Sequence, residues 1–184
     1  MANKKYELTD EKIEVMGQTL YRIKALRDLG DVTKGDLGGF VESENNLAHA
    51  GNAWVSGDAR VYGNAKVYGN ARVYGNAWVS GDARVYGNAR VYGDAWVSGD
   101  ARVSGNVEVD KPVINLIGIC SFSVTAYADF LQIGCELHTL AEWDEIAKDT
   151  SGKYIKMAGG EAEYQKCKAV LDFVKKIREI EQAG

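Results

Sequence analysis

The chain of 184 residues has little proline, cysteine or histidine, and each shortage excludes a class of protein. A single proline beside 21 glycines excludes both collagen and a proline-rich linker. Three cysteines cannot all pair with one another, which predicts reduced thiols and a cytoplasmic location. No apolar run approaches the roughly 18–20 residues of a membrane span, and no apolar signal segment follows the first residues. The sequence therefore predicts a protein without a membrane partner.

The middle of the chain is an uninterrupted hexapeptide repeat. Nine units run from Ala53 to Asn106, each reading Ala, then Trp, Arg or Lys, then Val, Tyr or Ser, Gly, and Asn or Asp. Ala and Val lie two residues apart and therefore point to one side of a short strand, while the residue between them points to the other. The Gly-Asn and Gly-Asp pairs tolerate the positive φ of a tight corner. Three strands and three corners close a coil of three hexapeptides, which predicts a parallel β-helix.

The repeat resembles the left-handed hexapeptide-repeat β-helix family, strongly over residues 53–106 and more loosely over 41–132. The left hand, and a homotrimer as the state of assembly, are implied by this resemblance alone. The Lys-Tyr-Glu-Leu-Thr start, the Gly-Asp-Leu-Gly-Gly-Phe segment and the later Ile-Gly-Cys-Glu-Leu-His-Thr-Leu-Ala-Glu-Trp segment also resemble hexapeptide-repeat proteins encoded by phages and prophages of Gram-positive bacteria. The resemblance does not imply one biochemical role.

The segments on both sides of the repeat are expected to cover its ends, because an open solenoid polymerises through its exposed strand edges. The fold class is therefore mainly β, in three parts. We expect an N-terminal β cap over residues 1–40, a left-handed β-helix over 41–112, and a small C-terminal β/α domain over 113–184.

Within these outer parts, the residue patterns predict individual elements. The cap reads as a hairpin of residues 12–16 and 19–25, which alternate around Gly17. Two strands are expected at residues 122–126 and 130–135. A capping box, Thr139-Leu140-Ala141-Glu142, opens one helix, and apolar residues at three-and-four spacing predict a second helix over residues 161–181.

The second column of outward residues, read at a stride of three hexapeptides, is the most apolar one. We expect Trp78 and Trp96 to stack, and Ile114 and Leu116 to continue the column. A contiguous apolar patch of this kind is rarely left exposed to solvent. Trp78, Trp96, Ile114 and Leu116 are therefore predicted to form a subunit interface or a docking surface for the C-terminal helices.

The third column combines cations with tyrosines: Lys66, Arg84 and Arg102 lie beside Tyr68 and Tyr86. Cations suit phosphates, and aromatic rings suit stacked bases. The alternative is an ordinary solvated face of the solenoid. Because the chain has a net charge of −4, it lacks the strongly basic footprint of a protein that binds duplex DNA. The column therefore predicts a site for a small anionic or nucleotide ligand.

No feature of the sequence supports catalysis. Acyltransferases on this scaffold need a His general base near a loop extruded between coils, yet residues 53–106 contain neither a His nor an interruption. His49 falls on the register of the inward Val and is expected to be a capping residue. His138 follows Cys135 by three residues, but a second pair of metal ligands is missing. A β-helical carbonic anhydrase needs three His, and this chain has two. No glycine motif for nucleotide phosphates occurs, so no catalytic residue, metal or cofactor is predicted.

The sequence thus favours a non-catalytic, oligomeric binding protein. Its partner is expected to be a small anionic ligand or a host defence protein. The phage resemblance sharpens this hypothesis to an anti-defence protein that sequesters a nucleotide signal in the cytoplasm of the host. The alternatives are a structural or assembly module, in which the solenoid is a spacer, and a degenerate hexapeptide acyltransferase.

Overall fold

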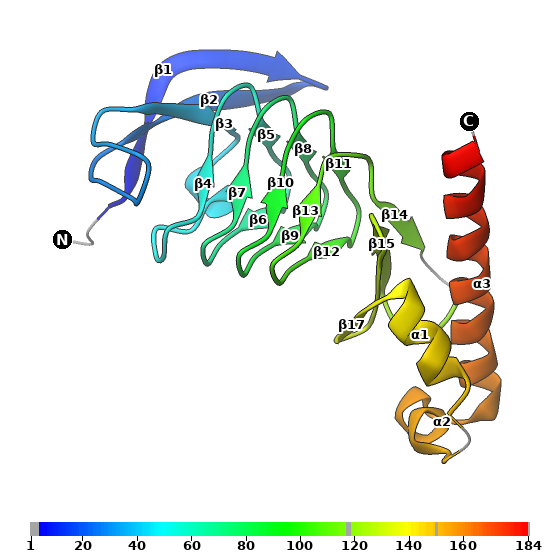
Figure 1. Ribbon diagram of the computed structural model, residues 1–184. Helices are drawn as coiled ribbons and strands as arrows, with labels where there is room; N and C mark the ends of the chain where they lie inside the picture. The colour runs from blue at the N-terminus through cyan, green and yellow to red at the C-terminus, as the bar shows by residue number, and fades with distance from the viewer. Residues whose placement is uncertain (1–3, 117–118, 150, 184) are drawn as a thin grey trace. The chain divides into compact units, whose positions relative to one another are not determined.

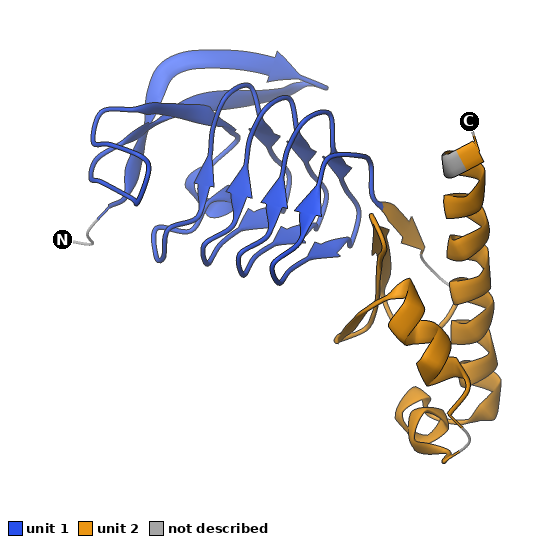
Figure 2. Ribbon diagram, viewed as in Figure 1, with its two compact units in different colours: residues 1–113 blue, residues 114–184 orange. Residues whose placement is uncertain are grey.

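The computed structural model describes residues 4–116, 119–149 and 151–183. The chain divides between Val113 and Ile114 into two compact units (Figure 2). The first unit holds the hexapeptide repeat and the segment before it, and the second holds the remaining strands and all of the described α-helices. Over the described ranges, no helix combines the length and the apolar character needed to cross a membrane.

The hexapeptides form a parallel β-solenoid, as predicted (Figure 1). Each unit supplies one two-residue strand, and each strand up to Arg90–Val91 pairs with the strand three hexapeptides later, as Trp54 does with Arg72. Three parallel sheets result, which we name the first face (β4, β7, β10, β13), the second face (β5, β8, β11) and the third face (β6, β9, β12). The left-handed sense of the coil stays a prediction. The strands are β4 (Trp54–Val55), β5 (Arg60–Val61), β6 (Lys66–Val67), β7 (Arg72–Val73), β8 (Trp78–Val79), β9 (Arg84–Val85), β10 (Arg90–Val91), β11 (Trp96–Val97), β12 (Arg102–Val103) and β13 (Glu108–Val109).

The inside of the solenoid is filled by alanine and valine alone over the regular coils. All nine repeat alanines and all nine repeat valines are fully buried. At the corners, each repeat glycine has a φ between 61° and 83°, a region that favours glycine because it has no Cβ. Glycines of successive coils also stack closely: a Cβ added to Gly81 would lie 2.9 Å from the backbone nitrogen of Gly99. The repeat sequence is therefore matched to this fold at both its inward and its corner positions.

Three longer strands build the N-terminal cap. β1 (Tyr6–Val15) and β2 (Gln18–Ala25) form an antiparallel hairpin, and β3 (Leu37–Val41) pairs with β2 on one side and with β5 on the other. The hairpin predicted from residues 12–16 and 19–25 is thus the distal part of a longer one. β3 runs antiparallel to β2 and parallel to β5. Since it pairs with both strands, it joins the cap to the second face in one continuous sheet.

The first coil is longer than the others by two positions. Val41 and Leu47 pair with Val61 and Val67, a stride two positions greater than the one that joins Trp54 to Arg72. The additional residues therefore lie between Leu47 and Trp54. This corrects the expected register of His49: Leu47 takes the inward position and is fully buried, while His49 is partly exposed in the longer corner.

Two buried polar side chains close the N-terminal end of the solenoid. The Lys5 ammonium donates a hydrogen bond to the carbonyl of Ala53 at 2.6 Å. The Asn46 amide donates to the carbonyls of Gly63 and Ala65, at 3.0 Å each. In the regular coils such carbonyls accept from the backbone N–H groups of a neighbouring coil. Lys5 and Asn46 thus provide donors where regular stacking stops, because buried carbonyls need hydrogen-bond partners.

The C-terminal unit is a four-stranded antiparallel sheet with helices. Its core contains Val124, Leu131, Trp143, Val170 and Val174. The predicted capping box is present, since the Thr139 hydroxyl accepts from the Glu142 N–H at 3.2 Å. Sequence reasoning missed the last strand and the short second helix. The elements are β14 (Ile114–Leu116), β15 (Val124–Tyr127), β16 (Phe130–Ile133), β17 (Glu136–Thr139), α1 (Leu140–Ala147), α2 (Lys153–Ala158) and α3 (Glu161–Ala183).

Ile114 and Leu116 belong to the sheet of the C-terminal unit, and their continuation of the tryptophan column stays a prediction. Both residues lie in β14, where they pair with Ala126 and Val124 of β15, and both pack against the core of the C-terminal unit. The Gly-Asx corners that keep the coils in register end at Asn106, and Pro112 has no N–H to give to a ladder. The sequence pattern that marks the regular stride therefore ends before Ile114.

Candidate functional site

The third face carries the predicted cationic and aromatic residues in one column. Lys66 pairs with Arg84, and Arg84 pairs with Arg102, so the three side chains lie in register on successive coils. The rings of Tyr68 and Tyr86 stack with centroids 5.0 Å apart and planes within 1° of parallel. We name Lys66, Tyr68, Arg84, Tyr86 and Arg102 the third-face stripe.

Two cations of the third-face stripe, Lys66 and Arg84, lack carboxylate partners among the described residues. Lys66 and Arg84 are exposed, and neither forms an ion pair with any residue that the structure describes. Burial raises the pKa of Tyr68, and the neighbouring Tyr86 adds to this rise, whereas the charges of Arg84 and Arg102 lower it. The positive charges of Arg84 and Arg102 thus lie close enough to the Tyr68 hydroxyl to favour its ionised form.

The first face offers a comparison within the same molecule, because it also carries arginines beside stacked tyrosines. Its arginines, however, are paired: Arg72 with Asp31 of the cap, and Arg90 with Glu108 at 3.1 Å. Identical residue types therefore present a neutralised surface on the first face and a cationic surface on the third.

The first face also borders an open groove of about 740 Å³, which sequence reasoning missed. One wall comes from the segment between β2 and β3, and the other from the solenoid strands β4, β7 and β10. These segments are far apart in the sequence, so only the fold reveals the groove. We name it the first-face groove; its lining residues are Asp31, Val32, Asp36, Leu37, Trp54, Ser56, Arg72, Tyr74 and Arg90.

The second face carries the tryptophan pair at its C-terminal end. The rings of Trp78 and Trp96 lie 6.0 Å apart with a tilt of 52°. The Arg60 guanidinium lies 4.8 Å from the Trp78 ring, whereas Trp96 is 45% exposed. Their role in a subunit interface stays a prediction.

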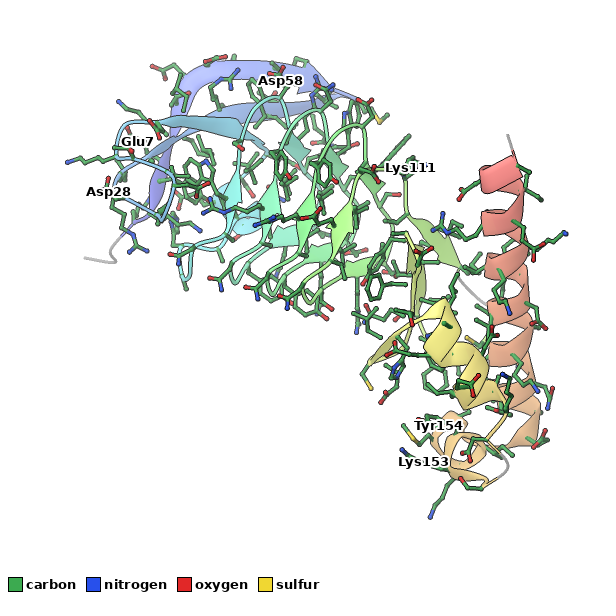
Figure 3. The ribbon with its side chains drawn as sticks, viewed as in Figure 1. Glu7, Asp28, Asp58, Lys111, Lys153 and Tyr154 are labelled. Atoms are coloured by element: carbon green, nitrogen blue, oxygen red, sulfur yellow. The ribbon has the colours of Figure 1, made fainter. Side chains whose placement is uncertain are left out.

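The C-terminal unit contains a small apolar cavity of about 140 Å³ between β16, β17, α1, α2 and α3. Its lining includes Trp143, Tyr154, Met157 and Cys167. Tyr154 and the adjacent Lys153 lie at the start of α2 (Figure 3), with the ammonium 4.9 Å from the ring. Burial, together with neighbouring Cys120, raises the pKa of Cys167 to about 12, so this thiol is protonated at neutral pH. The cavity suits an apolar group and offers no activated nucleophile from Cys167.

The two histidines are held by structural contacts. His49 stacks on Tyr6 with ring centroids 4.5 Å apart and accepts the Lys5 backbone N–H through Nδ1 at 3.3 Å. His138 lies 3.2 Å from the Glu136 carboxylate and contacts Trp143 edge-on. Within the described part of the chain, no three His, Cys, Asp or Glu residues gather as ligands for a metal ion.

One family model matches part of the repeat. The family model of the YdcK Beta solenoid repeat matches residues 65–81 and 83–99, which together make up less than a fifth of the chain. No curated protein matches the sequence. The matched segments include most of the third-face stripe: Lys66, Tyr68, Arg84 and Tyr86. The match supports a β-solenoid repeat protein and assigns no activity to these residues.

Proposed function

We propose that this protein binds a small anionic ligand of the nucleotide class at the third-face stripe, without catalysing a reaction. One observation carries the proposal. Lys66 and Arg84 are exposed and lack carboxylate partners among the described residues, and they lie beside a parallel pair of tyrosine rings. The equivalent arginines of the first face are neutralised by Asp31 and Glu108.

The stripe matches the two chemical parts of a nucleotide. Successive coils are about 4.8 Å apart, so two cations on neighbouring coils can hold one phosphate group between them. The tyrosine ladder contains Tyr68 and Tyr86 and ends at Ser104, which takes the equivalent position on the next coil. A base or sugar ring can therefore lie against Tyr86 while its phosphate contacts Arg84 and Arg102.

In its full form, the proposal describes a phage-encoded, homotrimeric protein that sequesters a nucleotide signal of host defence. The phage origin rests on the resemblance of the segments before and after the repeat to phage and prophage proteins. A homotrimer is proposed because related folds commonly form trimers and because Trp96 is exposed beside Trp78. Sequestration requires a high affinity and no chemical step, in keeping with the absence of a catalytic signal in the sequence.

Reversing the charge of the stripe tests the proposal. We expect Arg84→Glu combined with Arg102→Glu to weaken binding of a cyclic dinucleotide or ADP-ribose by at least tenfold, because a hydrogen bond to a charged group contributes about 1.5–3 kcal/mol. Isothermal titration calorimetry at low and physiological salt gives the affinity. Lys34→Glu with Lys111→Glu is the matched control, since both lysines are exposed, lie outside the stripe and carry the same charge.

The same titrations separate this proposal from its alternatives. Binding that weakens with salt and is lost only in the stripe variant supports the anion site. Binding that is indifferent to both charge pairs and to salt would place the ligand elsewhere. No binding of any anion would favour a structural module, and turnover of an acyl-CoA would favour an acyltransferase.

A further inference from the structure

We propose that the first-face groove is a second binding site, independent of the third-face stripe, and that it takes the flat heteroaromatic ring of a nucleoside. The lining of the groove includes Tyr74, Leu37, Ser56, Asp31 and Asp36. The ring would lie between Tyr74 and Leu37, over Ser56. Its recognition rests on stacking and hydrogen bonding, whereas the proposed function of the stripe rests on charge.

The groove arises from a step in side-chain size along one column. Tyr74 and Tyr92 stack with centroids 5.1 Å apart and planes 7° from parallel. The equivalent position on the preceding coil is Ser56, since Trp54 pairs with Arg72 across the same two coils. One face of the Tyr74 ring is thus covered by Tyr92, and the other is turned toward a level where a serine leaves room.

The opposite wall comes from the start of β3. A Cβ on Gly38 would lie 2.6 Å from the Val55 carbonyl, and a Cβ on Gly39 would lie 2.6 Å from the Ala59 carbonyl. Only glycine therefore lets β3 approach the first regular coil so closely. Because Phe40 pairs with Arg60, β3 lies one coil N-terminal to the first regular coil, and Leu37, which is 56% exposed, lines the groove from this side.

The spacing of the two walls fits one flat ring. Leu37 and Tyr74 lie on either side of the Ser56 coil, two steps of about 4.8 Å apart, or roughly 10 Å. A ring between them needs about 3.5–4.0 Å to each wall. The slot therefore has room for one ring, which would take the place in the ladder that a tyrosine at position 56 would fill. The groove of about 740 Å³ also has space for an attached sugar.

The charges at the groove select a ring that donates hydrogen bonds. Arg72 is held by Asp31 and by the Leu29 carbonyl, and Arg90 is paired with Glu108. Asp36 is exposed, and one of its carboxylate oxygens accepts from the Thr33 N–H at 2.8 Å. The remaining carboxylate oxygens at the edge can accept N–H groups of a nucleobase. Because Arg72 and Arg90 are already neutralised, the groove has no excess positive charge that would favour an anion.

Titration with guanosine and adenosine, which carry no phosphate, tests this inference. We expect the affinity for these nucleosides to be unchanged between low and physiological salt. We expect Tyr74→Ser to weaken the affinity by about tenfold or more, the loss typical of one base–aromatic stack. Tyr74→Phe keeps the ring and is expected to retain the affinity. Tyr92→Ser, on the covered side of the ladder, is the matched control and is expected to bind as the unchanged protein does.

The results of the nucleoside titration can be told apart from those of the stripe experiment. Nucleoside binding that survives Arg84→Glu with Arg102→Glu and is lost in Tyr74→Ser supports the groove, whether or not an anion binds the stripe. The inference is overturned if neither nucleoside binds at millimolar concentration. It is also overturned if Tyr74→Ser leaves binding intact, or if glucose and ribose bind as well as the nucleosides do, because the ring would then contribute nothing.

Discussion

Replacing Lys5 by methionine is expected to remove a pH dependence of stability from the N-terminal unit. The Lys5 side chain is fully buried, and its ammonium donates to the Ala53 carbonyl at 2.6 Å. Burial, and to a smaller extent the positive charges of Arg27 and Arg72, lower the pKa of this amine from 10.5 to about 8. The folded protein therefore releases this proton more readily than the unfolded chain does.

The number of protons bound to Lys5 in the folded and unfolded states sets the sign of this pH dependence. Between pH 8 and pH 10.5 the unfolded chain holds a proton on Lys5 that the folded protein has lost, so the free energy of unfolding rises with pH across this window. Below pH 8 both states are charged, and above pH 10.5 both are neutral, so the contribution is constant at either end. At about 1.4 kcal/mol per pH unit, the full rise is about 3 kcal/mol, and about 2 kcal/mol of it is reached by pH 9.5.

Urea denaturation at pH 7.0 and pH 9.5, under reducing conditions, measures this rise. The fluorescence signal of the unit that contains Lys5 comes from Trp54, Trp78 and Trp96. The quantity of interest is the stability of the unchanged protein minus that of Lys5→Met, because other titrating groups cancel in the difference. Lys4→Met, which removes an exposed amine paired with Glu44, is the control for the loss of one positive charge at this end of the chain. A difference for Lys5→Met that is flat, or that falls as pH rises, would refute the reasoning.

Two further predictions concern the packing of the coils. Ala83→Leu adds three carbons to a fully buried position, and we expect it to lower the free energy of unfolding by about 1–3 kcal/mol or more; an unchanged melting temperature would mean that the inward register is wrong. Gly81→Ala brings a Cβ to 2.9 Å from the Gly99 nitrogen at a φ of +66°, whereas Gly152→Ala has a similar φ of +77° and no atom within 4 Å. We therefore expect the larger loss of stability at Gly81, and equal losses in thermal denaturation would contradict close stacking of the corners.

The regular coils could be predicted from the sequence because each of their requirements is local and is repeated nine times. A narrow interior selects Ala and Val, and a tight corner selects Gly followed by Asn or Asp. The stacked rings of Tyr68 and Tyr86 and the adjacent, tilted rings of Trp78 and Trp96 then follow from a stride of three hexapeptides. The presence of exposed cations on the third face could be read in the same way.

The ends of the solenoid could not be predicted, because their features depend on single residues rather than on a repeat. Two additional residues in the first coil moved His49 out of the inward register. The end closure by Lys5 and Asn46 joins positions that are distant in the sequence and share no pattern. Ile114 kept an apolar side chain at the expected stride, yet it packs in another unit.

The pairing of the arginines also lay beyond sequence reasoning. Arg72 and Arg84 occupy the same position in their hexapeptides, and nothing in the repeat distinguishes them. Asp31, which neutralises Arg72, comes from the segment between β2 and β3 and meets it only through the fold. The contrast between a neutral first face and a cationic third face is therefore a property of the folded chain.

The solenoid has two periods, and they allow two kinds of change in length. Corners and inward residues recur with every hexapeptide, whereas a face recurs only with every third one. Loss or gain of three hexapeptides within the repeat keeps every downstream side chain on its face, much as a change of three nucleotides keeps a reading frame. Loss or gain of a single hexapeptide preserves the buried core equally well but moves every downstream side chain to the neighbouring face. Gain of one hexapeptide between Tyr68 and Tyr86 would separate their stacked rings while every alanine and valine of the repeat keeps an inward position. The surface of this protein can therefore change by slippage of its repeats while the pattern of buried residues is kept.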